Sequence, residues 1–392
     1  MDKSQKGYKP KVVFTYVEAG MGHIIPTRGV ADVFERKYGD KVEVVRSYVF
    51  KESKSKAVNK MGAMQDSHPK NLGNSKIYRV LESISYEFPS KFMLFWLDRA
   101  FGKGRKEFFN DLNEFDADLI FSTYYLPTHI AAQTNKKGLT NAIIASYAPD
   151  PYVYPAWDRE CDVLFVTNEP TKKQAVRRGY KEEVVKVVPF VYRKEIIEGY
   201  LEKDKAREKL GLNKDGYILL YTAGAYGTKG TEKLINAIVQ LDAEMQFVIV
   251  CGKNKEMYKS MCEIADKATG KTKIIPLGFV DNLNEYMSAS DCAIGKSGLG
   301  TIMECKYHGL PLIIYSESSR VEKETAKYAV KEGFAIREHS AKKVVELIKK
   351  DTLGKGYLKG LLKDASVRPI NGAEAVADEL FKMLQNKFTE LK

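Results

Sequence analysis

One passage from strand to turn to helix constrains this chain more than any other. Residues 292–294 are typical of a buried strand, residues 295–301 are rich in glycine and other small residues, and Glu304 lies on the helix predicted to follow. A helix start offers backbone N–H groups and the positive end of a dipole, and glycine lets an anion approach the backbone closely. Glu304, one helical turn further in, can accept hydrogen bonds from ribose hydroxyls. The passage therefore indicates a site for a nucleotide diphosphate.

The same order of strand, glycine turn and helix opens the chain. Residues 12–17 are a β-branched and aromatic run without alternation, residues 18–23 are a glycine turn, and residues 27–38 space their apolar side chains as a helix does. These elements predict the start of a doubly wound sheet. Further strands are expected at 118–123, 142–146, 163–167 and 184–188.

A second series of the same kind starts near Gly216. It begins with a strand at 217–222, a turn at 224–227 and a helix at 229–241. Strands then follow at 247–251, 273–276, 292–294, 312–315 and 334–336. Two consecutive series predict an α/β chain with two Rossmann-like, doubly wound lobes facing a cleft.

We expect the domain boundaries to follow these two series, since 392 residues suit two domains. The N-terminal lobe is predicted at 1–191 and the C-terminal lobe at 215–368, with a linker rich in lysine and glutamate at 192–214. A final segment at 369–392 has amphipathic helical spacing, which suits it to pack back on the N-terminal lobe.

Composition narrows the class of protein. The net charge of +12 fits nucleic acid, an anionic membrane surface or a phosphorylated substrate as partner, but the chain carries no recognisable nucleic-acid reader motif. The five cysteines lack metal-ligand spacing and several lie in apolar runs, which is typical of reduced core thiols in the cytoplasm. The polar N-terminus is unlike a signal peptide, and no apolar run approaches the roughly 18–20 residues of a membrane span.

Four segments carry a resemblance to a known family. They are residues 19–26, residues 150–169, residues 222–227 and residues 277–311. Together they resemble the GT-B glycosyltransferases, above all the group of monogalactosyldiacylglycerol synthase, bacterial diacylglycerol glucosyltransferase and the UDP-GlcNAc transferase of the peptidoglycan lipid precursor. The likeness extends over most of the chain, although the segment 222–227 is poorer in glycine than the family loop.

The resemblance implies a UDP-sugar donor held mainly by the C-terminal lobe. Backbone and hydroxyl groups of the late turn contact the diphosphate, a glutamate on the following helix holds the ribose, and backbone groups of an earlier loop read the base. Each assignment has an alternative. The turn could be a plain strand-to-helix connection, Glu304 a solvated helix carboxylate, and Phe279 a core residue. The donor-binding candidates are Gly22, Gly224, Phe279, Val280, Lys296, Ser297, Gly298, Gly300, Thr301 and Glu304.

Two residues are candidates for the base that takes the acceptor proton. His23 follows the first strand, where doubly wound sheets place their chemistry, and an imidazole suits proton transfer near neutral pH. The family has a functional histidine in this turn. Asp150 is the alternative base, unless it is an ordinary turn aspartate before proline. His129 fits a packing role better than a catalytic one.

No metal or other cofactor is expected. Asp116 and Asp118 form an Asp-x-Asp pair, but the pair precedes a predicted strand instead of ending one. We therefore interpret the pair as a loop feature. The resembling family neutralises its leaving group with helix N-termini and side chains.

Residues 90–106 are first apolar and aromatic and then basic, and they are too short to span a bilayer. Such a segment suits a helix at the interface of an anionic membrane. The resemblance implies that the lobe containing it takes the lipid acceptor. A buried helix with a basic cap is the alternative. The candidate membrane and acceptor residues are Phe92, Phe95, Trp96, Arg99, Lys103 and Arg105.

Together these observations predict an inverting, UDP-sugar-dependent glycosyltransferase on the inner face of the cell membrane, moving a hexose to diacylglycerol. Three alternatives stay open from sequence: a transferase acting on a polyprenyl-linked or soluble acceptor, a UDP-sugar 2-epimerase, and a non-catalytic protein that binds nucleotide sugars or lipid surfaces. A dinucleotide dehydrogenase fits poorly, because the early turn lacks the third glycine of that fingerprint.

Overall fold

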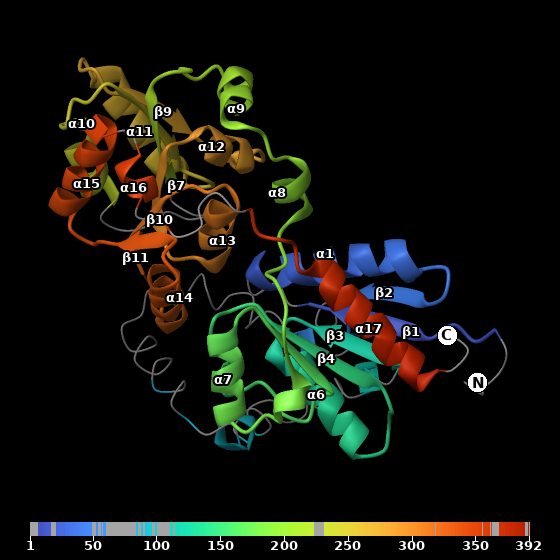
Figure 1. Cartoon of the computed structure of the whole chain (residues 1–392). Helices are drawn as coiled ribbons and strands as arrows, with labels where there is room; N and C mark the ends of the chain where they lie inside the picture. Colours follow the sequence, from blue (N-terminus) through green and yellow to red (C-terminus); the bar gives the residue numbers. More distant parts are fainter. Residues whose placement is uncertain are drawn as a thin grey trace. The chain divides into compact units, whose positions relative to one another are not determined.

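A computed structural model describes residues 7–16, 21–48, 52–53, 56, 58–59, 84, 88, 91–95, 99, 110–112, 114–222, 231–317, 319–354, 356–360, 362, 368–388 and 391. The chain forms two compact units, each with a six-stranded parallel sheet between helices (Figure 1). The first unit comprises Met1–Arg193, Ser319–Val321 and Ile370–Lys392, and the second Lys194–Ser318 and Glu322–Pro369. The predicted α/β class with two doubly wound sheets is confirmed.

The first sheet has the strand order β2-β1-β3-β4-β5-β6. Side chains alternate between its faces: Val13 packs into one core, and its neighbours Val12 and Phe14 pack into the other. Apolar residues on both faces explain why this strand shows no polar alternation in the sequence. The strands are β1 (Lys11–Thr15), β2 (Glu43–Ser47), β3 (Leu119–Ser122), β4 (Ile143–Ala148), β5 (Val163–Val166) and β6 (Val185–Val187).

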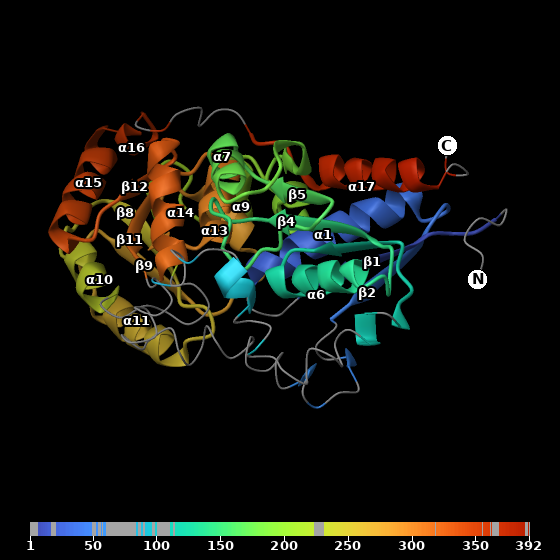
Figure 2. The same ribbon diagram turned by 90° about the horizontal axis from the view of Figure 1, so that it is seen from below.

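Helices cover both faces of this sheet. Helix α6 (Tyr125–Lys136) lies on one face, and α1 (Met21–Tyr38) and α17 (Ala373–Lys387) lie on the other (Figure 2). Helix α7 (Glu169–Arg177) and a short 3-10 turn at Glu182–Val184 connect β5 to β6.

The last helix of the chain completes the core of the first unit. Helix α17 packs along α1 (Figure 1), where the rings of Tyr38 and Phe381 stack at 3.9 Å. Leu380 and Leu384 are fully buried among residues of α1 and the sheet. The helix predicted from the apolar spacing at the C-terminus is therefore present, and its apolar face is covered by the first unit.

Two segments of the first unit, close to residues 190 and 371, are joined where the chain passes to and from the second unit. The backbone N–H of Tyr192 donates to the side chain of Asn371 at 3.1 Å, and that of Gly372 donates to the carbonyl of Phe190 at 2.9 Å. A Cβ on Gly372 would lie 1.8 Å from the carbonyl oxygen of Pro189. The two crossing segments therefore need glycine at this position to lie so close together.

The second sheet has the order β12-β11-β10-β7-β8-β9. Pro276, which cannot donate a hydrogen bond to a neighbouring strand, lies on the edge strand β9. The strands are β7 (Tyr217–Thr222), β8 (Met245–Val250), β9 (Lys273–Leu277), β10 (Cys292–Lys296), β11 (Leu312–Ser316) and β12 (Ala335–Arg337). The helices are α8 (Lys194–Glu198), α9 (Lys203–Leu210), α10 (Thr231–Val239), α11 (Lys255–Lys267), α12 (Leu283–Ala289), α13 (Leu299–Tyr307), α14 (Arg320–Lys331), α15 (Ala341–Gly354) and α16 (Tyr357–Gly360).

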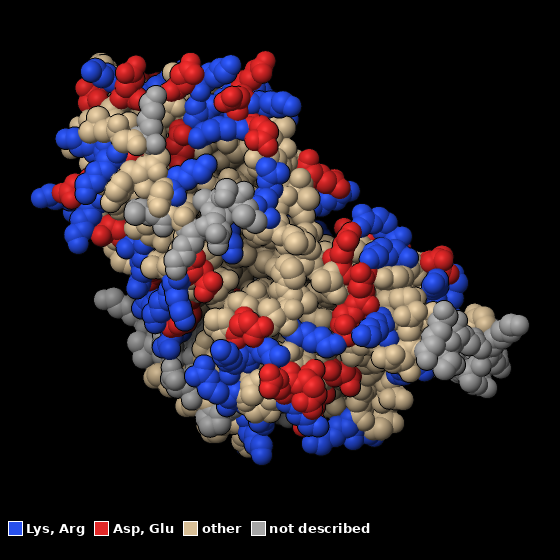
Figure 3. All heavy atoms as spheres, viewed as in Figure 1, with Lys and Arg blue, Asp and Glu red and all other residues tan. Residues whose placement is uncertain are grey.

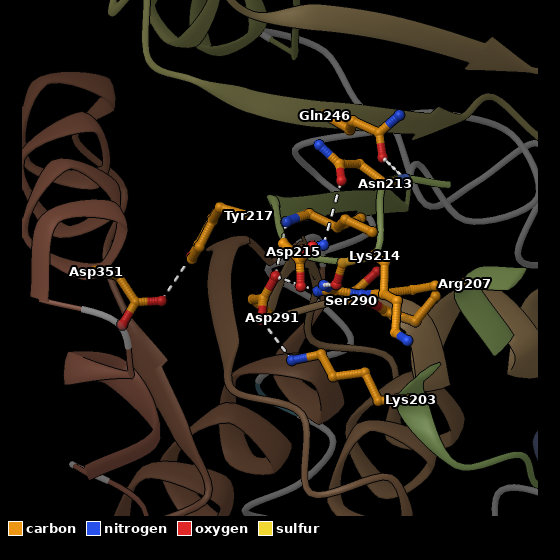
Figure 4. Close-up of polar contacts among 12 residues, drawn as sticks. Lys203, Arg207, Asn213, Lys214, Asp215, Tyr217, Gln246, Ser290, Asp291 and Asp351 are labelled. Carbon is orange, nitrogen blue, oxygen red and sulfur yellow. Dashed lines mark hydrogen bonds and ion pairs between the residues drawn. The ribbon is translucent and has the colours of Figure 1, made fainter. Parts of the chain in front are cut away.

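A buried guanidinium ties α9 to the amino end of this sheet (Figure 4). Arg207, only 5% exposed, donates to Asp291 at 2.8 Å and to the carbonyls of Ala289 and Lys214 at 2.9 and 2.6 Å. The same carboxylate accepts the backbone N–H of Ile218 at 2.7 Å. Part of the interval 192–214, interpreted from sequence as a linker, is thus held firmly in the second unit.

One helix starts several residues earlier than expected, and one strand was not predicted. Helix α1 begins at Met21 instead of residue 27, so the second half of the predicted glycine turn is helical and Pro26 lies inside the helix. Strand β2 is absent from the prediction because it is an edge strand with the charged residues Glu43 and Arg46, which obscure its short pattern.

Truncating the apolar face of α17 should destabilise the first unit. Leu380→Ala leaves a cavity in a fully buried position, and we expect a loss of about 2–5 kcal/mol. Both tryptophans, Trp96 and Trp157, belong to this unit, so urea unfolding followed by tryptophan fluorescence reports it selectively. The exposed Lys382→Ala is the matched control on the same helix. An unchanged midpoint for Leu380→Ala would contradict the assigned packing.

Candidate active site

In the first unit the candidate base His23 lies where the strand order of the sheet reverses. The chain passes from β1 to β2 on one side and later returns to β3 on the other side of β1. Successive connections leave opposite faces at this point, which is where open α/β sheets bind ligands. His23 lies in the first turn of α1, directly after β1, and Thr123 directly follows β3.

His23 is held in one orientation by two neighbours. Its Nδ1 lies 2.8 Å from the carbonyl oxygen of Thr123, and its ring meets the ring of Tyr124 edge to face at 5.1 Å. A carbonyl oxygen can only accept, so Nδ1 carries the proton of this hydrogen bond. In the neutral ring Nε2 is then the nitrogen with a lone pair, and it can accept a proton from a substrate.

Asp150 lies in the loop after β4 and interacts electrostatically with His23. Burial raises the pKa of the Asp150 carboxyl, and the attraction of His23 opposes that rise. Its neighbour Tyr147 accepts the backbone N–H of Val191 through the phenol oxygen at 3.1 Å. The two base candidates predicted from sequence are therefore brought together in one unit.

The second unit has an equivalent reversal between β7 and β10. Helix α13 starts at Leu299 straight after β10, with Gly298 at the N-cap in an extended conformation. The first N–H groups of a helix have no partner inside the helix, and here they follow the carboxyl end of a strand at the reversal. The strand, turn and helix start predicted around residues 295–301 are thus present, and their use as an anion site stays a prediction.

Ser297 adds a second polar group to this turn. It is only 1% exposed, and its hydroxyl has no hydrogen-bond partner among the residues that the structure describes. A buried hydroxyl without a partner is costly, because it has given up its bonds to water. A ligand oxygen at the helix start would satisfy it.

The glycines of the turn differ in what requires them. A Cβ on Gly295 would lie 2.8 Å from the Thr222 hydroxyl, so packing against β7 requires glycine there. At Gly300 a Cβ would meet no described atom within 4 Å, and at Gly298 none closer than 3.8 Å. Neither of these two has a positive φ. Packing among the described residues therefore explains Gly295 but leaves Gly298 and Gly300 open to a ligand.

The charged residues near the turn are paired or buried. Lys296 forms an ion pair with Glu322 at 3.1 Å, which offsets some of the charge expected to face an anion. Glu304 is only 8% exposed, so the alternative of a solvated helix carboxylate is wrong. Thr301 is half-buried on the first turn of α13.

Phe279 and Val280 follow the edge strand β9. Phe279 is 62% exposed, so its interpretation as a core residue is wrong. The ammonium group of Lys253, which follows β8, lies 5.5 Å from the centre of the Phe279 ring. This pair offers a flat, positively charged surface at the carboxyl edge of the sheet.

His129 has the packing role that was expected. Its Nδ1 lies 2.6 Å from Asp158, and both side chains are 3% exposed. Asp158 also accepts the backbone N–H of Glu160 at 3.0 Å. Although burial alone would raise the pKa of Asp158, these partners lower it overall. The pair is internal to the first unit and holds α6 to the loop after β4.

Two family models match this chain. The one described as "Monogalactosyldiacylglycerol (MGDG) synthase" matches residues 23–189, and the one described as "Glycosyltransferase family 28 C-terminal domain" matches residues 222–359. The first matched segment lies in the first unit, and the second lies in the second unit except for Ser319–Val321.

Curated relatives agree with the models. The chain is 31% identical over 223 residues to a processive diacylglycerol beta-glucosyltransferase of Bacillus pumilus, which is 56% of each chain. It is 23% identical over 351 residues to a probable chloroplastic monogalactosyldiacylglycerol synthase of Nicotiana tabacum, covering 86% of this chain and 64% of the relative. The chain thus spans between half and two thirds of the length of these two relatives.

Solved structures agree in fold. MurG of Acinetobacter baumannii superposes with a TM-score of 0.63 at 15% identity, covering 96% of this chain and 100% of that chain. A putative UDP-N-acetylglucosamine 2-epimerase of Listeria monocytogenes gives 0.61 at 14% identity, covering 97% of both chains. The chain has the GT-B fold, and both of its family matches are to glycosyltransferase models. The resemblance inferred from four sequence segments is confirmed.

The membrane residues expected of this GT-B protein are only partly described. Residues 91–95 are helical, and Phe92 and Phe95 are 43% and 59% exposed. Arg99 is exposed as well. Within the part of the chain that the structure describes, no helix is long and apolar enough to cross a bilayer. Trp96, Lys103, Arg105 and the donor-binding candidate Gly224 lie outside the described residues.

The Asp-x-Asp pair of this GT-B protein lies in the loop before β3, where Asp118 has a structural role. Asp118 accepts from the Tyr8 hydroxyl at 2.5 Å and from the backbone N–H of Lys11 at 2.9 Å. Both contacts lie at the amino end of the first sheet, whereas His23 lies at the carboxyl end. Among the described residues, no group of three or more His, Cys, Asp or Glu side chains could hold a metal ion.

Sequence reasoning missed Thr27 and Thr123, the partners of His23 in this GT-B chain. Thr123 lies 100 positions from His23, and an isolated threonine after a strand carries no motif. Thr27, four residues after His23, was interpreted only as a helix start. The available signal was that α1 starts and β3 ends at the same edge of the predicted doubly wound sheet.

Filling the open space at Gly300 should separate stability from ligand binding in this GT-B protein. Gly300→Ala places a methyl group in open space on a helix, so it should stabilise the fold by up to about 1 kcal/mol. The same methyl should weaken UDP binding at least tenfold, measured by calorimetric titration. Gly360→Ala on α16, where a Cβ likewise meets nothing described, is the control. Unchanged UDP affinity in Gly300→Ala would contradict the donor site.

Proposed function

We propose that this protein is an inverting hexosyltransferase that moves a hexose from a UDP-sugar to the hydroxyl of diacylglycerol. The names of its curated relatives, a diacylglycerol glucosyltransferase and a monogalactosyldiacylglycerol synthase, support both the reaction and the acceptor. The observation that carries the proposal is His23, whose Nδ1 is occupied by the Thr123 carbonyl and whose Nε2 is left as the base.

The proposed step is a single displacement. Nε2 of His23 takes the proton of the acceptor hydroxyl, and the acceptor oxygen forms a bond to the anomeric carbon. The bond from that carbon to the diphosphate oxygen breaks, and UDP leaves with the electron pair. One displacement at carbon inverts its configuration.

Charge on the departing diphosphate needs stabilisation, and we assign this to the start of α13. The backbone of Gly298, Gly300 and Thr301 and the hydroxyl of Ser297 are the donors that this turn supplies. We propose that Glu304 holds the ribose of UDP. Phe279 and Val280 are proposed to lie against the uracil ring of UDP. Such donors supply the charge stabilisation that the other main transferase fold takes from a metal ion, so we propose no metal or other cofactor.

Asp150 is proposed to support the base. After proton transfer the imidazole of His23 is positive, and the carboxylate of Asp150 is the nearby charge that stabilises it. In the alternative assignment Asp150 is itself the base, for which its raised pKa suits it. The two assignments predict different residual rates in the variants below.

Phe92 and Phe95 support a peripheral position at the inner face of the cell membrane. Two large aromatic side chains exposed on one short helical stretch favour the lipid interface over a buried helix. On the face of the molecule shown in Figure 3, basic and acidic side chains are interspersed over both units. The aromatic pair therefore carries the membrane proposal more directly than the net charge of +12.

The alternative functions differ from this proposal in the acceptor that they require and in whether they release UDP. A UDP-sugar 2-epimerase, whose fold is similar at 14% identity, would act on UDP-sugar without any acceptor. A transferase for another acceptor would respond to polyprenyl phosphate or a soluble sugar instead of diacylglycerol. A binding protein would bind UDP and release none from a UDP-sugar.

UDP release across a grid of UDP-glucose, UDP-galactose and UDP-GlcNAc against these acceptors is the test. With the best pair, His23→Ala should lower kcat by about 10²–10⁴-fold because the base is lost. Asp150→Asn should lower kcat less, about tenfold, if the carboxylate only stabilises the imidazolium. His339→Ala, an exposed histidine in the second unit, should keep the parent rate.

Three outcomes contradict the assignment. Release of UDP that never depends on diacylglycerol would exclude the proposed acceptor. A full rate in His23→Ala would exclude the histidine as base. A larger loss in Asp150→Asn than in His23→Ala would transfer the role of base to the aspartate.

Membrane binding is tested separately. Replacing Phe92 and Phe95 together with serine should lower the affinity for vesicles of phosphatidylglycerol and phosphatidylcholine at least tenfold, since each buried aromatic contributes roughly 1.5–3 kcal/mol when fully removed from water. Pelleting with vesicles measures it. Tyr258→Ser, which removes an aromatic that is 42% exposed in the second unit, is the control. Equal pelleting of the double variant and the parent would refute this contact.

A further inference from the structure

His23 and Thr123 are joined by hydrogen bonds in both directions. The ring Nδ1–H of His23 donates to the backbone carbonyl of Thr123 at 2.8 Å, and the hydroxyl of Thr123 donates to the backbone carbonyl of His23 at 2.6 Å. The first bond fixes the ring, and the second fixes the backbone that carries the ring. Together they tie the start of α1 to the end of β3.

Thr27 closes this arrangement. Its hydroxyl lies 3.1 Å from the same His23 carbonyl and 2.8 Å from the Thr123 hydroxyl. Thr123 and Thr27 are 0% and 1% exposed, so water does not compete for these bonds. The two hydroxyls and the carbonyl form one buried polar cluster directly beneath the proposed base.

The partner of Nδ1 has a chemical consequence. A carboxylate in this place could receive the proton or share positive charge, but a backbone carbonyl can do neither. It can only select which nitrogen of the neutral ring bears hydrogen. The support for His23 is therefore divided: orientation comes from the threonine cluster, and counter-charge comes from Asp150 across the site.

We propose that Thr123 and Thr27 are positioning residues that hold His23 as the Nδ1–H tautomer, with Nε2 aimed at the acceptor hydroxyl. This inference rests on the proposed function for its kinetic consequence, although the tautomer itself does not depend on which reaction is catalysed. Neither threonine is assigned a contact with substrate, so both act through the histidine.

The tautomer is tested by nitrogen NMR. The chain has only five histidines, so labelling with ¹⁵N-histidine gives few signals, and comparison with His23→Gln assigns the one of interest. In the neutral ring the proton should lie on Nδ1. A proton on Nε2 in the parent protein would overturn the proposal.

Positioning is tested by kinetics on isosteric variants. Thr123→Val removes the hydroxyl and keeps the shape, and it should lower kcat about tenfold while KM for the UDP-sugar stays within twofold. Thr27→Val should act in the same direction. Thr123→Ser restores the hydroxyl and should recover most of the rate. A kcat for Thr123→Val within twofold of the parent would overturn the positioning role.

Thr134→Val is the matched control for loss of a buried hydroxyl. Thr134 is 1% exposed and donates to the Ala131 carbonyl in α6 at 2.7 Å, without contact to the cluster. It should lose a similar amount of thermal stability and keep kcat. If Thr123→Val fails to fold, Thr27→Val is judged by the same limits. If no pair of donor and acceptor releases UDP, the proposed reaction fails, and the nitrogen shifts still decide the tautomer.

Discussion

Every candidate group of this protein depends on one constraint, the direction in which parallel strands point. Because all strands of a sheet run the same way, their following loops gather at one edge, and the reversal of strand order leaves room between two of those loops. In the first unit the reversal lies between β1 and β3, and it places His23 beside Thr123. In the second unit it lies between β7 and β10, and it presents the start of α13.

Buried charge elsewhere in the molecule serves the architecture. Arg207 and Asp291 hold α9 at the amino end of the second sheet, and His129 and Asp158 hold α6 in the first unit. Arg207, Asp291 and Asp158 each have additional hydrogen bonds that compensate for the loss of water. Ser297 is the contrast, since its buried hydroxyl has no partner among the described residues, and that deficit is what marks its turn as a place for a ligand.

The sequence predicts those parts of the site that lie within one continuous segment. The turn before α13 could be found because strand, glycines and helix follow one another directly in residues 292–304. The exposure of Phe279 and the pairing of Lys296 with Glu322 could not, because both depend on how distant elements pack. The support of His23 by Thr123 is the clearest case: the two residues, 100 positions apart, meet only because β3 pairs directly with β1.

The position of α17 has a consequence for how the protein is made. The core of the first unit includes Val376, Leu380 and Leu384, which are synthesised only after the residues of the second unit. The ribosome therefore completes the entire second unit while the earlier unit still lacks one wall of its interior. The first unit is therefore begun first but completed last, and a truncation before Ala373 removes part of the core of that unit.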